Sequence, residues 1–128
     1  MKPYLLFVDD QPMLGTLMEM SFSEAGINTK LATSANVALD LIKQDKNHSI
    51  KVLFTDIHLP PGNSGWWLIE EVKKIRDNIK YMVISADMDS REKGKNMVIT
   101  GDLYAYFEKS GGVNQDIIMT QCKKAMSE

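Results

Sequence analysis

Short apolar stretches alternate along this 128-residue chain with longer amphipathic ones. The short stretches are rich in β-branched, aromatic and large aliphatic residues, and they predict strands at residues 4–8, 28–32, 51–55, 81–85 and 103–107. The longer stretches carry apolar residues three and four positions apart, and they predict helices at residues 12–25, after residue 34, at 66–76, at about 90–100 and at 114–126. This alternation predicts an α/β fold, a parallel sheet covered by helices on both faces with right-handed crossovers.

Local signals place the ends of several predicted helices. Pro12 suits a first helical turn, where its missing N–H costs nothing, and Gly26 ends the same helix. Ser34 suits the N-cap of the second helix, and Asp89 with Glu92 predicts a capping box for the fourth. Helical spacing predicts these inward-facing residues: Met13, Leu14, Leu17, Met18 and Phe22; Val37, Ala38, Leu41 and Ile42; Leu68, Ile69, Val72 and Ile75; Ile117, Ile118, Cys122 and Ala125.

Composition narrows the class of protein. With 44% apolar and 25% charged residues the chain reads as globular, and its length predicts one domain spanning residues 1–128. The net charge of −2 and the lack of a basic stripe argue against direct nucleic-acid binding. The single cysteine, Cys122, rules out an internal disulfide and a thiolate metal cluster. No apolar run approaches the ~20 residues of a membrane span, so we expect no membrane association and a cytoplasmic location.

Polar residues that carry chemistry follow the predicted strands. Asp9 and Asp10 follow the first strand, Asp56 the third, Ser85 ends the fourth, and Lys109 comes shortly after the fifth. Open parallel sheets bind ligands beyond the carboxyl ends of their strands, where the strand order reverses. If the first and third strands are neighbours, three carboxylates converge there and need compensating positive charge. The lysine supplies one such charge, and oxygen ligands without His or Cys suit Mg²⁺.

Such a cluster favours phosphoryl chemistry. A carboxylate beside Mg²⁺ and a lysine can attack a phosphoryl group and form an acyl phosphate, whose oxygens a nearby hydroxyl and backbone N–H groups then hold. Each residue taken alone has a structural explanation, since an aspartate at a strand end is commonly a turn residue or a helix cap. The ordered set at the ends of four strands is what favours a functional site.

With these residues in place, the chain resembles the receiver domain of two-component response regulators. The resemblance runs through "FVDDQP", "LFTDIHLP", "VISA" and "YFEK" and so covers nearly the whole chain. It implies a doubly wound, flavodoxin-like sheet of five parallel strands in the order 2-1-3-4-5. By analogy Asp56 is the phosphoacceptor and Asp10 a direct ligand of Mg²⁺, with Mn²⁺ as an alternative ion. Asp9 would act through water, while Asp56 and the backbone carbonyl of His58 would complete the metal site.

The same resemblance implies a signalling mechanism rather than an enzyme with turnover. A histidine kinase or a histidine phosphotransfer protein would donate a phosphoryl group to Asp56, with at most self-phosphorylation from small donors and autodephosphorylation besides. Ser85 matches the phosphate-binding hydroxyl, Lys109 the family's lysine, and Tyr106 its aromatic switch. The face of the fourth helix, fifth strand and fifth helix would then change and regulate a partner protein, an attached effector or a homodimer. Gly94 should weaken the fourth helix, which fits a low-energy switch.

The chain departs from the family pattern in three places. Ser110 follows Lys109 where the family usually has proline, often with a cis bond, so the isomer of this bond stays open. The loop from Asp56 to Gly65 is one residue longer than usual, and "TGDLYAY" replaces the usual Gly-Ala pair before the fifth strand. The last of these differences is one residue out of register, and it bears on the alignment of the fourth helix.

Two positions near the proposed site are candidates for setting how long a phosphoryl group persists. His58 and Asp87 lie two residues after Asp56 and Ser85, at positions that vary among receivers and flank the path of an attacking water. We hypothesise that they set the rate of dephosphorylation. The alternative is that His58 and Asp87 are solvated loop side chains that do not affect dephosphorylation.

Three other functions compete with this interpretation. A receiver-fold interaction module could signal without phosphorylation, although such proteins usually lack one of the five polar residues. A phosphohydrolase on a similar sheet typically carries Asp-x-Asp on its first strand, whereas here the two aspartates are adjacent. A flavin-binding protein would need a Ser-, Thr- or Gly-rich phosphate loop where this chain has "DDQPML".

Overall fold

The predicted alternation of strands and helices is confirmed. The computed structural model describes residues 2–109 and 114–128. Its strands are β1 (Tyr4–Val8), β2 (Thr29–Ala32), β3 (Ile50–Asp56), β4 (Lys80–Ser85) and β5 (Ala105–Glu108). Its α-helices are α1 (Pro12–Glu24), α2 (Ala35–Gln44), α3 (Gly65–Ile75), α4 (Arg91–Thr100) and α5 (Gln115–Ser127), and a short 3₁₀ turn, η1 (Met88–Ser90), precedes α4. The predicted boundaries therefore hold to within a few residues.

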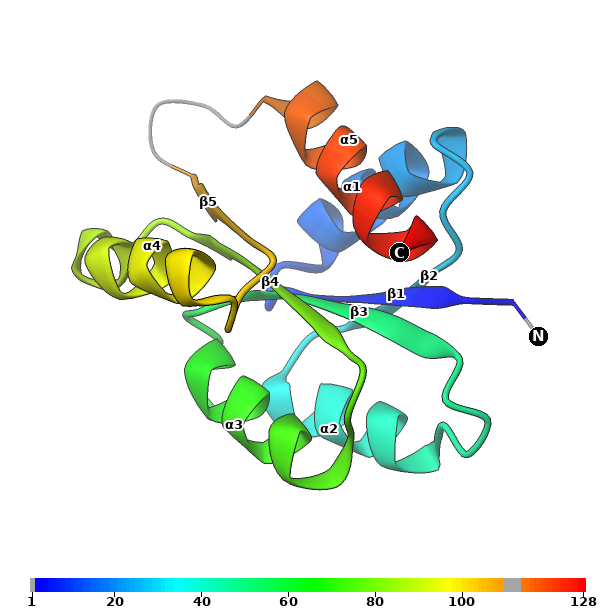
Figure 1. Ribbon diagram of the computed structural model, residues 1–128, viewed down its shortest axis with the longest axis horizontal. Coiled ribbons are helices and arrows are strands. Elements are labelled where there is room, and N and C mark those ends of the chain that lie inside the picture. The colour runs from blue at the N-terminus through cyan, green and yellow to red at the C-terminus, as the bar shows by residue number, and fades with distance from the viewer. Residues whose placement is uncertain (1, 110–113) are drawn as a thin grey trace.

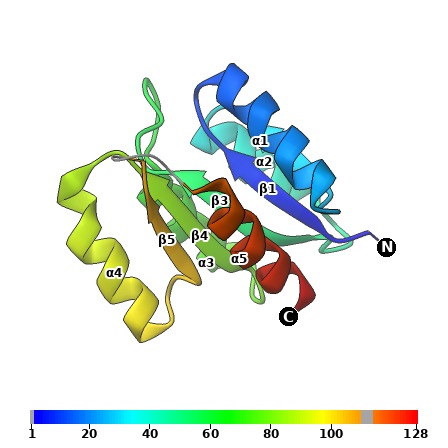
Figure 2. The same ribbon diagram turned by 90° about the horizontal axis from the view of Figure 1, so that it is seen from above.

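All five strands form one parallel sheet in the order β2-β1-β3-β4-β5. Helices α1 and α5 cover one face and α2 and α3 the other, while α4 lies beside the edge strand β5 (Figures 1 and 2). The chain turns from β2 on one side of β1 to β3 on its other side, so the strand order reverses at β1 and β3. This is the place where an open parallel sheet gathers its ligand site.

The core has two layers, one on each face of the sheet. Side chains alternate along a strand, so Leu5 and Phe7 of β1 face α1 and α5, whereas Leu6 and Val8 face α2 and α3. On the first face the rings of Phe7 and Phe54 meet edge to face, with centroids 5.2 Å apart. Strands β1, β3 and β4 are almost wholly buried, as their continuous apolar sequence predicts.

Several predicted helix faces are wrong in detail. Gly15 of α1 and Leu39 of α2 are buried instead, because each helix contacts the sheet along a narrower strip than its apolar residues suggest. On α1, Gly15 faces Leu31 of β2, whose side chain would lie 3.7 Å from a Cβ at position 15. The residues predicted to face inward that are exposed are Met13, Leu17, Val37, Ile75 and Ile117.

The predicted capping box at Asp89 and Glu92 is also wrong. The side chain of Asp87 accepts the backbone N–H of Asp89 at 2.9 Å and so begins the 3₁₀ turn. Helix α4 then follows Ser90, whose side chain makes no cap hydrogen bond. The acceptor lies two residues earlier than the sequence pattern indicated because the 3₁₀ turn intervenes before the helix.

A buried ion pair ties the end of α3 to the start of β3. The carboxylate of Asp45 accepts N–H groups of Ser49 and Ile50 at 3.0 and 2.8 Å, and Arg76 Nη1 lies 3.2 Å from it. Burial opposes the charge of Asp45, but these hydrogen bonds, together with that of the Ser49 hydroxyl, lower its pKa to about 2. The pair therefore fixes the end of the sheet opposite the polar strand ends.

Within the described residues, no helix has both the length and the apolar character needed to cross a bilayer.

Candidate functional site

Three aspartates meet where β1 and β3 end. The two strands run side by side with Val8 opposite Thr55, so the residues that follow Val8 lie next to Asp56. One carboxylate oxygen each from Asp9, Asp10 and Asp56 lies within 4.8 Å of the others. Asp9 and Asp56 are buried and Asp10 is half-buried. The convergence expected from neighbouring first and third strands is therefore present.

Lys109 supplies positive charge to this cluster. Its Nζ donates to Asp56 Oδ2 at 2.6 Å and to Asp9 Oδ2 at 3.1 Å. Its backbone N–H donates to the Ser85 carbonyl oxygen at 2.9 Å. This bond extends the β4–β5 pairing by one residue and fixes the backbone position from which the side chain projects. Partial burial works against its charge, but the bonds and attraction to Asp56 and Asp9 outweigh this and raise the pKa of Lys109.

Backbone N–H groups hold the other oxygens of the two buried carboxylates. The N–H of Gln11 donates to Asp9 Oδ1 at 2.9 Å, and that of His58 donates to Asp56 Oδ1 at 3.2 Å. Burial has the largest effect on Asp56 and raises its pKa. Lys109 and the His58 N–H oppose this rise, and the charge of Asp9 adds to it. The carboxylate of Asp56 is thus fixed in position while its charge is only partly compensated.

The loop after Asp56 returns tightly against it. Gly65 begins α3 and donates its N–H to the Ile57 carbonyl oxygen at 2.9 Å. A Cβ at position 65 would lie 3.0 Å from the Asp56 carbonyl carbon and closer still to its oxygen. Glycine is therefore required here for close packing against Asp56.

Ser85 ends β4, beside the strand that carries Asp56. It is buried, and its hydroxyl oxygen accepts the N–H of Asp87 at 2.9 Å. A cavity of about 30 Å³ adjoins it, close to the volume of one water molecule. Across this cavity Arg91 Nε lies 2.7 Å from Glu108 Oε1, an ion pair that no local sequence signal predicted.

The two residues hypothesised to set phosphoryl lifetime contact each other. His58 Nε2 lies 3.3 Å from Asp87 Oδ2. The hydroxyl of Ser90 donates to the same Asp87 oxygen at 2.9 Å and accepts the indole N–H of Trp66 at 3.4 Å. Sequence reasoning missed the contacts of Ser90 and Trp66, because they join the start of α3 to the turn after β4, two segments that are distant in the sequence. Their presence shows that neither His58 nor Asp87 is an isolated loop side chain.

Tyr106 lies on β5 opposite Val83 of β4, with its ring against α4. Its hydroxyl oxygen is buried and has no hydrogen-bond partner among the described residues. Burial raises the pKa of Tyr106. The ring is therefore turned toward the molecule rather than toward solvent.

The ligand set fits a hard divalent cation. Three carboxylates without His or Cys are the donors that Mg²⁺ prefers. Asp10 is the most accessible of the three, which suits a direct ligand, and Asp9 is already engaged by Lys109 and Gln11. The roles assigned to these residues, and to the His58 carbonyl, stay predictions. The Lys109–Ser110 bond, whose isomer the sequence left open, lies outside the described residues.

Comparisons with known proteins point to one family. The family model described as the response regulator receiver domain matches residues 5–115. A chemotaxis protein CheY homolog of Campylobacter jejuni is 31% identical over 97% of this chain and 86% of its own length. Chemotaxis protein CheY1 of Helicobacter pylori strain 26695 is 29% identical over 97% of this chain and 90% of its own length.

Solved structures share the fold. A response regulator receiver domain protein from Clostridium thermocellum superposes with a TM-score of 0.82 at 19% identity, covering 98% of this chain and 94% of that one. The receiver domain of the Francisella response regulator 1452 gives a TM-score of 0.81 at 24% identity, covering 98% of both chains. At these identities the likeness extends to the fold alone.

Proposed function

The chain belongs to the response regulator receiver domain family, and from that membership we propose that it is a phosphoacceptor signalling switch whose one receiver domain spans residues 1–128. One observation carries the proposal. The Asp56 carboxylate lies at the strand-order reversal among two further aspartates, with Lys109 Nζ at 2.6 Å. A nucleophilic carboxylate, a place for a cation and a compensating lysine are the parts that phosphoryl transfer to an aspartate needs.

The transfer proceeds from a phosphohistidine of a histidine kinase or a histidine phosphotransfer protein. An oxygen of Asp56 attacks phosphorus, the N–P bond breaks with its electron pair returning to the imidazole, and an acyl phosphate forms. Lys109 holds the carboxylate in place, and Ser85 donates its hydroxyl to a phosphoryl oxygen. When bound by Asp10, Asp56 and the His58 carbonyl, with Asp9 acting through water, Mg²⁺ or Mn²⁺ neutralises charge on the phosphoryl oxygens.

The output follows from a rearrangement around Ser85. To reach a phosphoryl group, its hydroxyl gives up the hydrogen bond that it now accepts from Asp87. Tyr106 is in position to respond, since it lies on the strand adjacent to β4 and its hydroxyl is buried near Ser85 without a hydrogen bond of good geometry among the described residues. The face of α4, β5 and α5 then presents a changed surface to a partner protein, an attached effector or a second copy of the chain.

His58 and Asp87 set how long the phosphoryl group persists. Their contact at 3.3 Å links the residue two after the phosphoacceptor to the residue two after Ser85, which supports a shared role beside Asp56. Phosphoryl half-lives of His58→Ala and Asp87→Ala are the test. We expect both to differ from the wild type, and unchanged half-lives in both variants would refute this role.

Small phosphodonors and a phosphoryl mimic test the function as a whole. We expect Mg²⁺-dependent labelling by acetyl phosphate and binding of beryllofluoride by the wild type, and neither by Asp56→Asn. Lys109→Arg should keep partial activity because it retains the charge. A wild type that responds to neither reagent would favour an interaction module that signals without phosphorylation, and turnover of added phosphoesters would favour a phosphohydrolase.

A further inference from the structure

Helix α4 contacts the rest of the molecule mainly through partly exposed side chains, and its one buried position is a glycine. Among its ten residues, all of which the structure describes, only Gly94 is buried. Met97 is half-buried and packs against the core, while Val98 and Ile99 are exposed. Glycine is the poorest helix former after proline, so its place at the centre of the buried face calls for a packing reason.

The packing reason is the ring of Tyr106. A Cβ built at position 94 would lie 2.7 Å from Tyr106 Cγ and closer still to Cδ2. Real side chains do not approach so closely, so the ring occupies the space that any other residue at position 94 would fill. The obstacle is one side of an aromatic ring rather than backbone, and rotation of Tyr106 about its χ1 bond is the movement that would relieve it.

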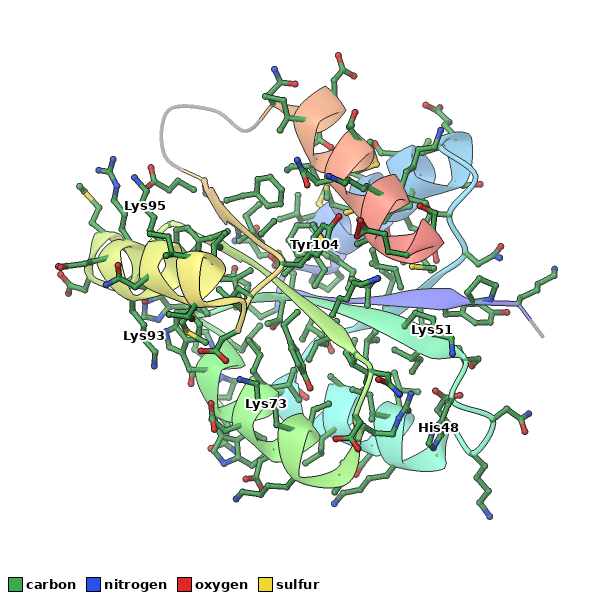
Figure 3. The ribbon with its side chains drawn as sticks, in the orientation of Figure 1. His48, Lys51, Lys73, Lys93, Lys95 and Tyr104 are labelled. Carbon is green, nitrogen blue, oxygen red and sulfur yellow. The ribbon has the colours of Figure 1, made fainter. Side chains whose placement is uncertain are left out.

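The neighbours of Gly94 show that this contact lies on the inner face of the helix. Figure 3 shows Lys93 and Lys95 on either side of α4. Lys93 Nζ lies 4.5 Å from the centre of the Trp66 ring, on the side of α3, and Lys95 lines a groove between α4, β5 and α5. Gly94 lies between these two directions and faces Tyr106.

We propose that Gly94 is the positioning residue for Tyr106, a notch in α4 that admits the ring to its inward position. The proposal rests on the switch role of Tyr106 under the proposed function, which it deepens. A side chain at position 94 turns the ring outward, toward the groove of about 500 Å³ whose walls include Tyr106, Val98, Phe107 and Ile117. The notch thereby links the position of one ring to the shape of the surface that a partner reads.

A double-mutant cycle on the unliganded protein tests the notch. In the wild-type background we expect Gly94→Ala to lower Tm. With Tyr106→Ala the obstruction is gone, and the same change should raise Tm by about 3 °C because alanine is the better helix former. Asn96→Ala, exposed two positions along α4, is the matched control and should raise Tm in both backgrounds. A Gly94→Ala effect of the same sign in both backgrounds would overturn the proposal.

The environment of the Tyr106 ring is a second measurement, and a change in helix propensity alone would leave it unchanged. In protein labelled with 3-fluorotyrosine, the Tyr106 signal is assigned by its loss in Tyr106→Phe. We expect Gly94→Ala, but not Asn96→Ala, to shift this signal to a solvent-exposed environment. A signal that stays in the buried environment in Gly94→Ala would refute the notch.

Beryllofluoride with Mg²⁺ separates this proposal from the proposed function. We expect Gly94→Ala to bind beryllofluoride as the wild type does, since Asp56 is untouched, but its Tyr106 signal should no longer respond to binding. If the wild type fails to bind beryllofluoride, the phosphoacceptor role fails while the unliganded cycle still decides the notch. If Gly94→Ala binds and its Tyr106 signal responds as in the wild type, the positioning role is wrong.

Discussion

Replacing Lys109 by methionine tests whether charge compensation holds the acidic site together. The side chains of Asp9 and Asp56 are 0% and 7% exposed, and Lys109, at 22%, donates to both. Methionine keeps most of the aliphatic stem and removes the ammonium group. The variant therefore leaves two buried carboxylates close together without the cation that compensates their mutual repulsion.

The expected loss follows from this geometry. Breaking a buried ion pair by removing one partner costs about 3–5 kcal/mol, and the partial exposure of the lysine places this case near 3 kcal/mol. In an Asp56→Asn background position 56 carries no charge, although its amide oxygen can still accept from Nζ, so the charged bond lost is the longer one, to Asp9 at 3.1 Å, and the expected cost falls to about 1.5 kcal/mol. The coupling between Lys109 and Asp56 should then be about 1.5 kcal/mol.

Urea unfolding at pH 7 without Mg²⁺, followed by circular dichroism for all four members of the cycle, measures this coupling. Lys95→Met, an exposed lysine on α4, is the control for loss of a positive charge and should change stability little. Equal losses from Lys109→Met in both backgrounds would show that Lys109 contributes by packing alone. A Lys109→Met variant more stable than the wild type would contradict the compensation argument outright.

Three further predictions concern the site and its frame. Asp10→Ala should weaken Mg²⁺ binding in calorimetry more than Asp9→Ala, because Asp10 is the more accessible carboxylate, and equal losses would contradict the assigned roles. Gly65→Ala should lower stability in urea by about 2 kcal/mol, because its Cβ would overlap the Asp56 carbonyl, and a neutral effect would show that the loop relaxes easily. The pKa of Asp45 is lowered from 3.8 to about 2, so its contribution of about 2 kcal/mol is present above pH 3.8 and lost as the pH falls toward 2. Asp45→Asn should be less stable at about pH 5 and should lack this part of the acid-dependent loss, so parallel curves for the two proteins would contradict it.

The predicted strands and helices were largely correct because their signals are local. An apolar run of strand length or a recurrence at three and four positions is a property of neighbouring residues, and the structure follows it within a few residues. The clustering of the polar residues that follow the strands could also be predicted, since parallel strands bring their carboxyl ends to one edge of the sheet. The order 2-1-3-4-5 was not in the pattern and came from the family resemblance.

The predictions failed where contacts between helices and strands determine which side chains are buried. Val37 was predicted to face inward and Leu39 was not, because periodicity marks an apolar stripe without fixing which strip of it meets the sheet. Gly94 was predicted only as a weak point of its helix, since propensity measures a residue against its own helix and not against a ring on β5. The contact of Trp66 with Ser90 joins the first turn of α3 to the 3₁₀ turn η1 and has no local signature.

The sequence by itself determined the chemical groups of this protein and their order along the chain, because residue type and spacing are local properties. Only the tertiary structure decided which of those groups touch. Lys109 is 100 residues from Asp9 in the chain and 3.1 Å from it in space, a closeness produced by the pairing of strands rather than by any motif. The same pairing places Tyr106 against Gly94, where the absence of a side chain leaves the space that the ring occupies.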